Sequence, residues 1–205
     1  MRLALFGGTG RTGRLLVAQA LDDGHQVAAF VRSPERLPIT HPDLTKVPMG
    51  DPGPRALSAG MKGADAVVSV LNGSTRAGSP AATWTRAALS AMAECGVRRL
   101  VVTSAAPVPL RGGPAPLAYR LVGWVFRDAH RDLAAMEDIV RGSDVAWTIV
   151  RPPRLTNGPR TGRYRLETGG NVPRGLSLSR ADLAGAVLHL IDDPAVAGRG
   201  VGIAY

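Results

Sequence analysis

Cysteine and aromatic residues are both scarce in this chain of 205 residues, which has one cysteine, Cys95, and 4% aromatic residues. A single cysteine cannot form an intrachain disulfide, which is typical of a protein from a reducing compartment, and we expect a cytoplasmic protein. With few aromatic side chains, aliphatic residues and alanine must fill most of the core. The length suits one domain with a full core, and no shift in composition marks a boundary.

Long apolar runs are also missing. No segment approaches the roughly 20 apolar residues that a membrane-spanning helix requires. The apolar run at the N-terminus stops at Gly7, which argues against a secretory signal peptide. We therefore expect no membrane partner.

Lysine is the third scarce residue, since every basic residue except Lys46 and Lys62 is arginine. The net charge is +9, but the arginines are dispersed and no basic helix carries interleaved aromatics. This pattern does not favour nucleic acid as a partner. A positive field of this kind would still attract phosphorylated or carboxylated small molecules.

Short apolar runs alternate with segments of helical periodicity along the whole chain. Strands are expected at 2–7, 25–32, 44–51, 64–73, 97–106, 145–153 and 200–205, and helices at 11–24, 54–63, 79–96, 124–140 and 179–194. Residues 162–167 alternate and could add a short strand, Ser79 could cap the third helix, and Ser179 with Asp182 resembles a capping box. This order predicts right-handed βαβ units and a single α/β domain over 1–205, a Rossmann-type doubly wound parallel sheet flanked by helices.

The first strand runs into the glycine-rich stretch "FGGTGRTG", which opens the first helix. Two glycine registers are present, Gly8–Gly10–Gly13 and Gly7–Gly10–Gly13. Glycines at this turn let the backbone approach a pyrophosphate, and the helix N-terminus supplies free N–H groups. The context of strand, glycine loop and helix predicts dinucleotide binding.

The end of the second strand discriminates between the two nicotinamide cofactors. An acidic residue there would accept a hydrogen bond from the ribose 2′-hydroxyl of NAD. This chain has Arg32 at that point, followed by Ser33 and Arg36, and Arg11 lies within the loop. Arginine can bind a 2′-phosphate through charge-assisted hydrogen bonds, so we expect NADP(H) as the cofactor.

The ends of the other strands should meet the ligand at the same edge of the sheet. In chain order these residues are Asp51 near the adenine, Asn72 and Gly73 under the ribose and pyrophosphate, Thr103 and Ser104 near the nicotinamide, and Pro152, Pro153 and Arg154 after the sixth strand.

Taken together, these stretches resemble the atypical short-chain dehydrogenases/reductases. "FGGTGRTG" is similar to the GATGxTG loop of NmrA-like proteins and of the biliverdin reductase B-like flavin reductases, and "VRSPERL", "MGD", "TSA" and "LSRADLAGAVL" follow in that family's order. The resemblance implies an NADPH-dependent reductase that passes hydride to a flavin or bilin. It favours the Gly7–Gly10–Gly13 register, in which Gly8 is the replaceable glycine. It also implies the following roles: Gly7, Thr9, Gly10, Arg11, Thr12 and Gly13 hold the pyrophosphate, Arg32 and Arg36 hold the 2′-phosphate, and Ser104 and His130 face the reaction centre.

The chain lacks the Tyr-x-x-x-Lys pair that performs proton transfer in ordinary alcohol dehydrogenases of this kind, because no tyrosine has a lysine four residues later. Hydride transfer to a conjugated ring needs less from the protein, which supplies geometry and electrostatics around the cofactor. We therefore predict a conjugated acceptor of the flavin, bilin or quinone type. Ser104 would orient the nicotinamide or the acceptor, and His130 would hydrogen-bond one of the two.

The acceptor region is predicted to be formed by residues 107–127 and 152–178. Tyr119 and Trp124 could stack on a planar ring, and Arg111 and Arg154 could bind its carboxylates or phosphates. Arg154 stands where mammalian flavin reductases of the resembled group carry a histidine. No His, Cys or Asp spacing indicates a metal. A redox sensor that binds NADP(H) without turnover remains the alternative, and the oligomeric state stays open.

Overall fold

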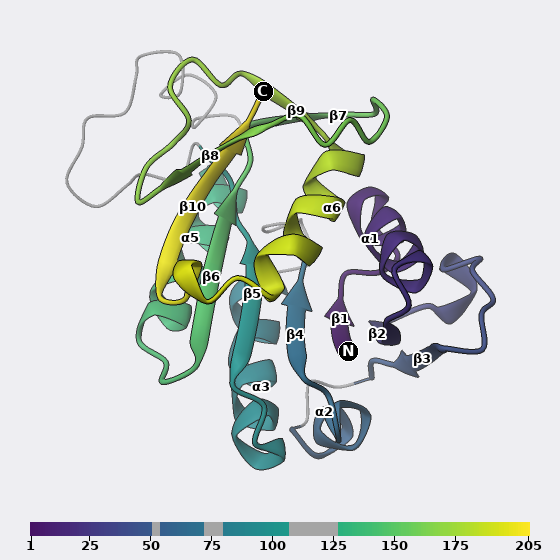
Figure 1. Cartoon of the computed structure of the whole chain (residues 1–205). Coiled ribbons are helices and arrows are strands. Elements are labelled where there is room, and N and C mark those ends of the chain that lie inside the picture. The colour runs from purple at the N-terminus through teal and green to yellow at the C-terminus, as the bar shows by residue number, and fades with distance from the viewer. Residues whose placement is uncertain (51–53, 72–79, 107–126) are drawn as a thin grey trace.

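The central element is a sheet of eight strands in the order β3-β2-β1-β4-β5-β6-β10-β8 (Figure 1). The computed structural model describes residues 1–50, 54–71, 80–106 and 127–205. The strands in chain order are β1 Arg2–Phe6, β2 Gln26–Val31, β3 Leu44–Pro48, β4 Ala66–Ser69, β5 Arg99–Thr103, β6 Ala146–Arg151, β8 Arg165–Thr168 and β10 Arg199–Ala204. All neighbours pair in parallel except β8, which pairs antiparallel with β10. The predicted doubly wound sheet is confirmed.

Helices cover both faces of this sheet. Helices α1 Arg11–Asp22 and α6 Arg180–Ile191 pack side by side on one face, and α2 Pro54–Met61, α3 Pro80–Cys95 and α5 Arg127–Arg141 cover the other. Figure 1 shows α6 beside α1 in front of the strands, with α3 and α5 passing behind them. Short 3₁₀ turns occupy Pro34–Arg36 (η1) and Pro194–Val196 (η2).

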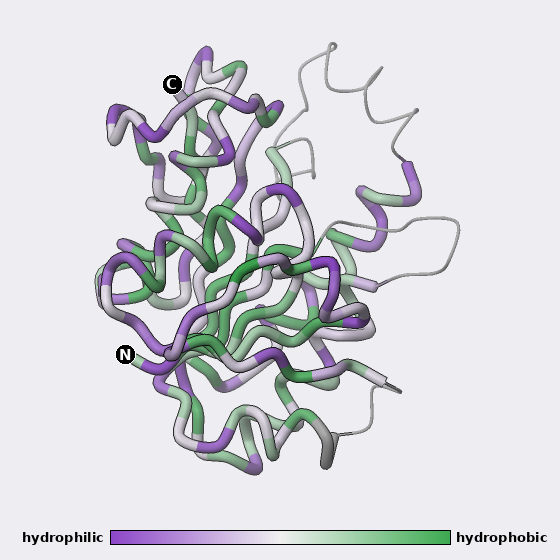
Figure 2. Tube along the Cα trace, turned by 90° about the vertical axis from the view of Figure 1, so that its right-hand side faces the viewer, coloured by the Kyte–Doolittle hydropathy of each residue, from purple (hydrophilic) through white to green (hydrophobic). Residues whose placement is uncertain are grey.

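Two apolar layers result, one on each face of the sheet. Because both faces are covered, β1, β2, β4 and β5 are apolar along most of their length and do not alternate. Leu5 contributes to the layer under α1 and α6, while Phe6 stacks on Phe30 with ring centroids 4.6 Å apart in the opposite layer. Figure 2 shows the hydrophobic segments in the middle of the molecule and the hydrophilic ones around its outside.

Three local features differ from, or add to, the sequence prediction. The short strand expected near 162–167 is confirmed as β8, at 165–168. A parallel pair, β7 Arg154–Thr156 with β9 Ser177–Ser179, was not predicted, because three residues are too few to show a period. The helix expected at 124–140 is described from Arg127 to Arg141, and residues 124–126 lie outside the described part of the chain.

The start of α3 is held by a residue from another helix. The backbone N–H groups of Ala81 and Ala82 each donate to the carboxylate of Asp132 in α5, at 3.0 Å. Asp132 is buried, and its charge compensates the positive end of the α3 dipole. The predicted cap, Ser79, lies outside the described residues.

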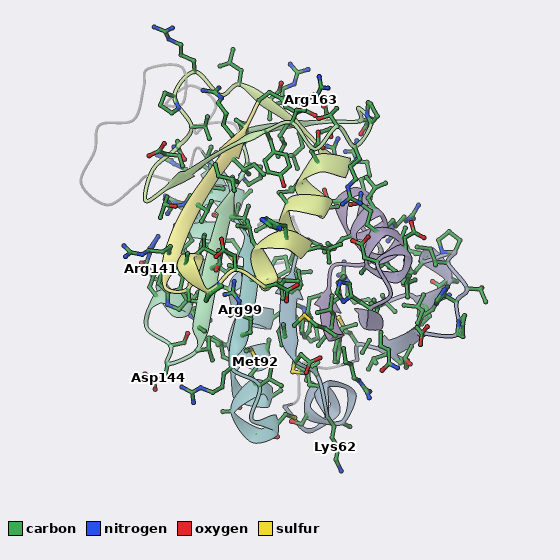
Figure 3. All side chains as sticks on the ribbon, viewed as in Figure 1. Lys62, Met92, Arg99, Arg141, Asp144 and Arg163 are labelled. Carbon is green, nitrogen blue, oxygen red and sulfur yellow. The ribbon has the colours of Figure 1, made fainter. Side chains whose placement is uncertain are left out.

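The C-terminal end of α6 is capped by Arg99 of β5. The guanidinium of Arg99 donates to the last carbonyls of α6, those of Leu190 and Ile191, and to that of Ala146. Figure 3 shows Arg99 beside this end of the helix. Burial lowers the pKa of Arg99, and the nearby Asp193 and Asp192 oppose that shift. In the described parts of the chain, no helix has the length and apolar character needed to cross a membrane.

Helix α6 begins with Ser179 as its cap, as predicted, but only half of a capping box forms, because the Ser179 N–H donates to Tyr205 Oη and not to Asp182. Ser179 Oγ accepts the backbone N–H of Asp182 at 2.9 Å, and the buried Asp182 carboxylate accepts hydrogen bonds from Tyr205 Oη, Thr161 and Gly162. Burial alone would raise the pKa of Asp182. The hydrogen bonds outweigh burial and lower the pKa from 3.8 to about 2. This carboxylate therefore ties the loop after β7 and the C-terminal residue to α6.

This arrangement predicts a pH-dependent stability. A carboxyl with a depressed pKa stabilises the folded state above its unfolded pKa, and the contribution is lost as the pH falls from about 4 through about 2. The contribution is about 2 kcal/mol. Thermal unfolding of the wild type should show this loss between pH 5 and pH 2, whereas Asp182→Asn should start less stable and lose less over the same range. An equal acid-induced loss in both proteins would contradict the assignment.

Candidate nucleotide site

The glycine loop between β1 and α1 adopts the Gly7–Gly10–Gly13 register. Gly7 has φ +87°, a conformation that favours glycine, and a Cβ there would lie 2.9 Å from the carbonyl oxygen of Val70. A Cβ on Gly13 would lie 2.0 Å from the carbonyl oxygen of Gly7, which no other residue type could tolerate. At Gly8 the nearest atoms would be side-chain carbons of Leu5 and Val17 at 3.4 and 3.5 Å, which is ordinary contact.

Gly10 is different from these three glycines. It caps α1 in an extended conformation with φ −72°, and a Cβ there would meet only the carbonyl oxygen of Gly7, at 3.3 Å. The protein itself therefore requires glycine at Gly7 and Gly13 more strongly than at Gly10. A strict requirement for glycine at Gly10 would come from a ligand lying against the backbone.

The N-terminus of α1 is open, unlike those of two neighbouring helices. No side chain caps α1 and its first turn contains no acidic residue. By contrast, Asp132 caps α3, and Ser179 caps α6 with Asp182 in the first turn. Of α1, α3 and α6, only α1 keeps its positive end free of a carboxylate, and Arg11 at its first position adds a charge. A helix end of this kind can bind an anion.

The predicted 2′-phosphate residues follow β2 on a single 3₁₀ turn. Arg32 lies two residues before this turn and Arg36 is its last residue. Both are exposed, and the N–H of Arg36 donates to the carbonyl of Ser33 at 3.0 Å. Leu37 is completely buried and anchors the turn. Among the described residues neither guanidinium has an acidic partner, so both remain available to an anion.

At the end of β5, two adjacent hydroxyls have different environments. Thr103 Oγ1 donates to the carbonyl of Ser69 at 3.4 Å. Ser104 is 8% exposed, and its Oγ has no hydrogen-bond partner among the residues that the structure describes. An unpaired buried hydroxyl is destabilising, and such groups are typical of sites that a ligand completes.

The backbone around Ser104 is fixed to the end of β6. Ser104 N–H donates to the carbonyl of Val150 at 2.8 Å, and Ala106 N–H donates to that of Pro152 at 2.9 Å. Pro152 is buried, Pro153 half-buried, and Arg154 is exposed at the start of β7. The predicted residues Thr103, Ser104 and Pro152 are thus close together at one edge of the sheet.

His130 lies in the first turn of α5 and is half-buried. Burial lowers the pKa of His130 below its usual value, so the neutral imidazole prevails at neutral pH. A neutral imidazole can act as a hydrogen-bond donor or acceptor, and the role of His130 stays a prediction.

Several predicted residues lie outside the described part of the chain: Asp51, Asn72, Gly73, Arg111, Tyr119 and Trp124. They stay predictions. One residue that the sequence reading missed is Asn171, whose amide nitrogen donates to the carbonyl of Ala106 at 3.0 Å. It follows two glycines in a segment with no clear period, so nothing in the sequence marks it as close to Ser104.

Comparison with known proteins identifies the family. Residues 7–194 match the family described as NAD(P)H-binding, and the chain belongs to that family. The match begins at Gly7, the first glycine of the loop described above. The glycine loop and the open N-terminus of α1 both lie within the matched residues.

Solved structures agree with this fold. A short-chain dehydrogenase/reductase from Veillonella parvula in complex with NADP has a TM-score of 0.83 at 20% identity, over 100% of this chain and 94% of that chain. A Rossmann-fold NAD(P)-binding family protein from Shigella flexneri has a TM-score of 0.73 at 25% identity, over 98% and 92% of the two chains. ChuY, an anaerobilin reductase from Escherichia coli O157:H7, has a TM-score of 0.82 at 18% identity, over 98% and 97%.

Proposed function

We propose that this protein is an NADPH-dependent reductase that transfers hydride to a conjugated acceptor of the flavin, bilin or quinone type. The observation that carries the proposal is the buried, unpaired hydroxyl of Ser104 at the carboxyl edge of β5. It lies on the same edge of the sheet as the open α1 N-terminus. A dinucleotide bound there would extend from the glycine loop toward Ser104.

The residues present fit the cofactor. Gly7 and Gly13 leave space for a tight loop, and the first N–H groups of α1, with Arg11, would hold the pyrophosphate. When bound, NADPH supplies the hydride. The protein would orient the nicotinamide or acceptor through Ser104, and His130, mainly neutral, would donate or accept one hydrogen bond without adding charge.

The choice of NADPH over NADH rests on Arg32 and Arg36. Both guanidiniums are exposed and lack acidic partners in the described residues. Arg32 also stands where an acidic residue would accept a hydrogen bond from the 2′-hydroxyl of NADH. A 2′-phosphate between two arginines forms charge-assisted hydrogen bonds.

Charge reversal at Arg32 tests this choice. We expect Arg32→Glu to weaken NADPH binding about 10- to 100-fold and to change NADH binding by about twofold or less, because only NADPH carries the 2′-phosphate. Isothermal titration with both cofactors measures this. Arg86→Glu, on the exposed side of α3, is the matched control for the change in net charge and should leave both affinities near those of the wild type. Equal losses for NADPH and NADH would refute the role of Arg32.

A redox sensor that binds NADP(H) without turnover is the second candidate. The absence of the Tyr-x-x-x-Lys pair favours neither candidate, because neither needs it. Purified protein mixed with NADPH and riboflavin, FMN, biliverdin or menadione separates the two, with nicotinamide absorbance as the readout. Turnover with any of these acceptors supports the reductase, whereas tight NADPH binding with no turnover on all four would establish the sensor instead.

A further inference from the structure

Asn171 carries a second buried polar atom without a partner, close to Ser104. Its Nδ2 donates to the carbonyl of Ala106 at 3.0 Å, while its Oδ1 is buried and has no hydrogen-bond partner in the described part of the chain. The orientation of the amide is fixed, because turning it over would place Oδ1 against the Ala106 carbonyl oxygen. The side chain thus holds one unused acceptor in a defined position.

The segment that carries Asn171 is packed tightly onto the sheet. A Cβ on Gly202 of β10 would lie 2.4 Å from the carbonyl oxygen of Gly170 and 2.9 Å from the Cα of Asn171. Only glycine in β10 allows this approach. Val172, the next residue, is buried and accepts the N–H of Gly175 at 3.0 Å. Asn171 is therefore held by the fold at the carboxyl end of β10 and not by a loose loop.

Asn171 and Ser104 are joined through Ala106. Ala106 follows Ser104 by two residues, so their Cα atoms are at most about 7 Å apart. Ala106 is bound on one side by the Pro152 carbonyl and on the other by the Asn171 amide. The two unpaired atoms, Ser104 Oγ and Asn171 Oδ1, thus belong to one connected group of residues, and a single fused-ring acceptor could reach both.

We propose that Asn171 Oδ1 accepts a hydrogen bond from a ring N–H of the acceptor. This inference rests on the proposed reductase function and extends it to acceptor selection. The carbonyl oxygen of an amide can only accept, so its partner must be a donor. Flavins carry an imide N–H, and linear tetrapyrroles carry several ring N–H groups. A simple quinone presents only acceptor oxygens and would leave Asn171 Oδ1 unpaired, so the site discriminates against it.

The test changes the ligand and the protein together. Riboflavin is compared with 3-methylriboflavin, in which a methyl group replaces the imide hydrogen, and menadione serves as an acceptor without N–H. For the wild type, kcat/KM should fall about 10- to 100-fold from riboflavin to 3-methylriboflavin, as expected for one hydrogen bond to a buried group. In Asn171→Ala the two flavins should differ by about twofold or less, and menadione reduction should rise relative to riboflavin reduction, because the variant no longer leaves an unpaired amide oxygen against the quinone.

Gln19 provides a matched control on another part of the fold. Its Nε2 also donates to a backbone carbonyl, that of Ala181 at 3.1 Å, and its Oε1 is also buried without a partner, but it lies between α1 and α6. Gln19→Ala should keep the wild-type preference for riboflavin. Loss of the preference in Gln19→Ala would show that it reflects general loosening of the fold and would overturn the proposal.

The remaining outcomes are equally decisive. A wild type that treats the two flavins alike overturns the proposal without any need for the variant to fold, as does an Asn171→Ala protein that keeps the preference. If no acceptor oxidises NADPH, riboflavin fluorescence titrated with the NADP-loaded protein replaces the kinetic readout. Tighter binding of riboflavin than of 3-methylriboflavin would then support Asn171 while the reductase proposal fails, and equal or absent binding would overturn both.

Discussion

Replacing Glu137 by glutamine is expected to lower the free energy of unfolding by about 3–5 kcal/mol. Glu137 in α5 and Arg151 at the end of β6 form an ion pair whose side chains are 5% and 3% exposed. Arg151 Nε donates to Glu137 Oε1 at 2.9 Å, a second bond joins Nη2 to Oε2, and Arg141 Nη2 donates to the same carboxylate at 3.1 Å. Removing the carboxylate leaves the Arg151 charge buried without compensation.

Chemical denaturation with urea measures this effect. The control is Asp128→Asn in the same helix, where Asp128 and Arg131 pair at 3.6 Å with side chains 81% and 69% exposed, and the loss should stay below about 1 kcal/mol. Because Arg151 directly precedes Pro152, the substitution should also weaken the backbone bond between Ala106 and Pro152. A loss for Glu137→Gln no larger than that of the control would contradict the importance of this pair.

Gly13→Ala is expected to destabilise the protein by about 3 kcal/mol or more, whereas Gly8→Ala should change stability by about 1 kcal/mol or less. The difference follows from the space at each Cβ position, 2.0 Å from a backbone oxygen at Gly13 against 3.4 Å from a flexible side chain at Gly8. Backbone cannot move away as a side chain can. The two glycines, five residues apart in the same glycine motif, thus have opposite tolerance.

Gly10→Ala is the third variant of this series, and it is expected to lower NADPH affinity with little effect on stability. Its Cβ would approach the carbonyl oxygen of Gly7 at 3.3 Å, so the fold should survive with a loss of about 1 kcal/mol. NADPH affinity should fall by about tenfold or more, because the methyl group would stand between the helix N-terminus and the pyrophosphate. Thermal unfolding and cofactor titration of the three variants test this order. If Gly8→Ala abolished NADPH binding while Gly13→Ala folded normally, the register of the loop would be wrong.

The sequence was sufficient for the features that depend on local pattern. The glycine register, the cap of α6 at Ser179, and the short strand near residue 165 were all predictable, because turn chemistry and periodicity act over a few residues. The family match from residue 7 agrees with the predicted dinucleotide loop. The positions of Ser104 and Arg32 at strand ends followed from the alternation of strands and helices.

The interactions that the sequence did not reveal join distant residues. Helical spacing indicates which side of α5 is apolar, but not that charged Asp132 and Glu137 on that helix are buried. Each buried carboxylate is compensated by a partner on another element: Asp132 by the start of α3, and Glu137 by Arg151 at the end of β6. Asn171 was missed for the same reason, since its proximity to Ala106 depends on how Gly202 of β10 packs against Gly170 and Asn171.

The contact between α1 and α6 has a consequence for how the protein is made. Gln19 binds the carbonyl of Ala181 across 162 positions of sequence, so the helix that follows the glycine loop is covered by a helix that is synthesised long after it. Pairings of such long sequence separation form slowly. Until α6 emerges, the apolar face of α1 and the strands beneath it stay exposed, and the growing chain is prone to aggregation. A dinucleotide held at the N-terminus of α1 would therefore require α6 to be in place, although α1 precedes α6 in the chain.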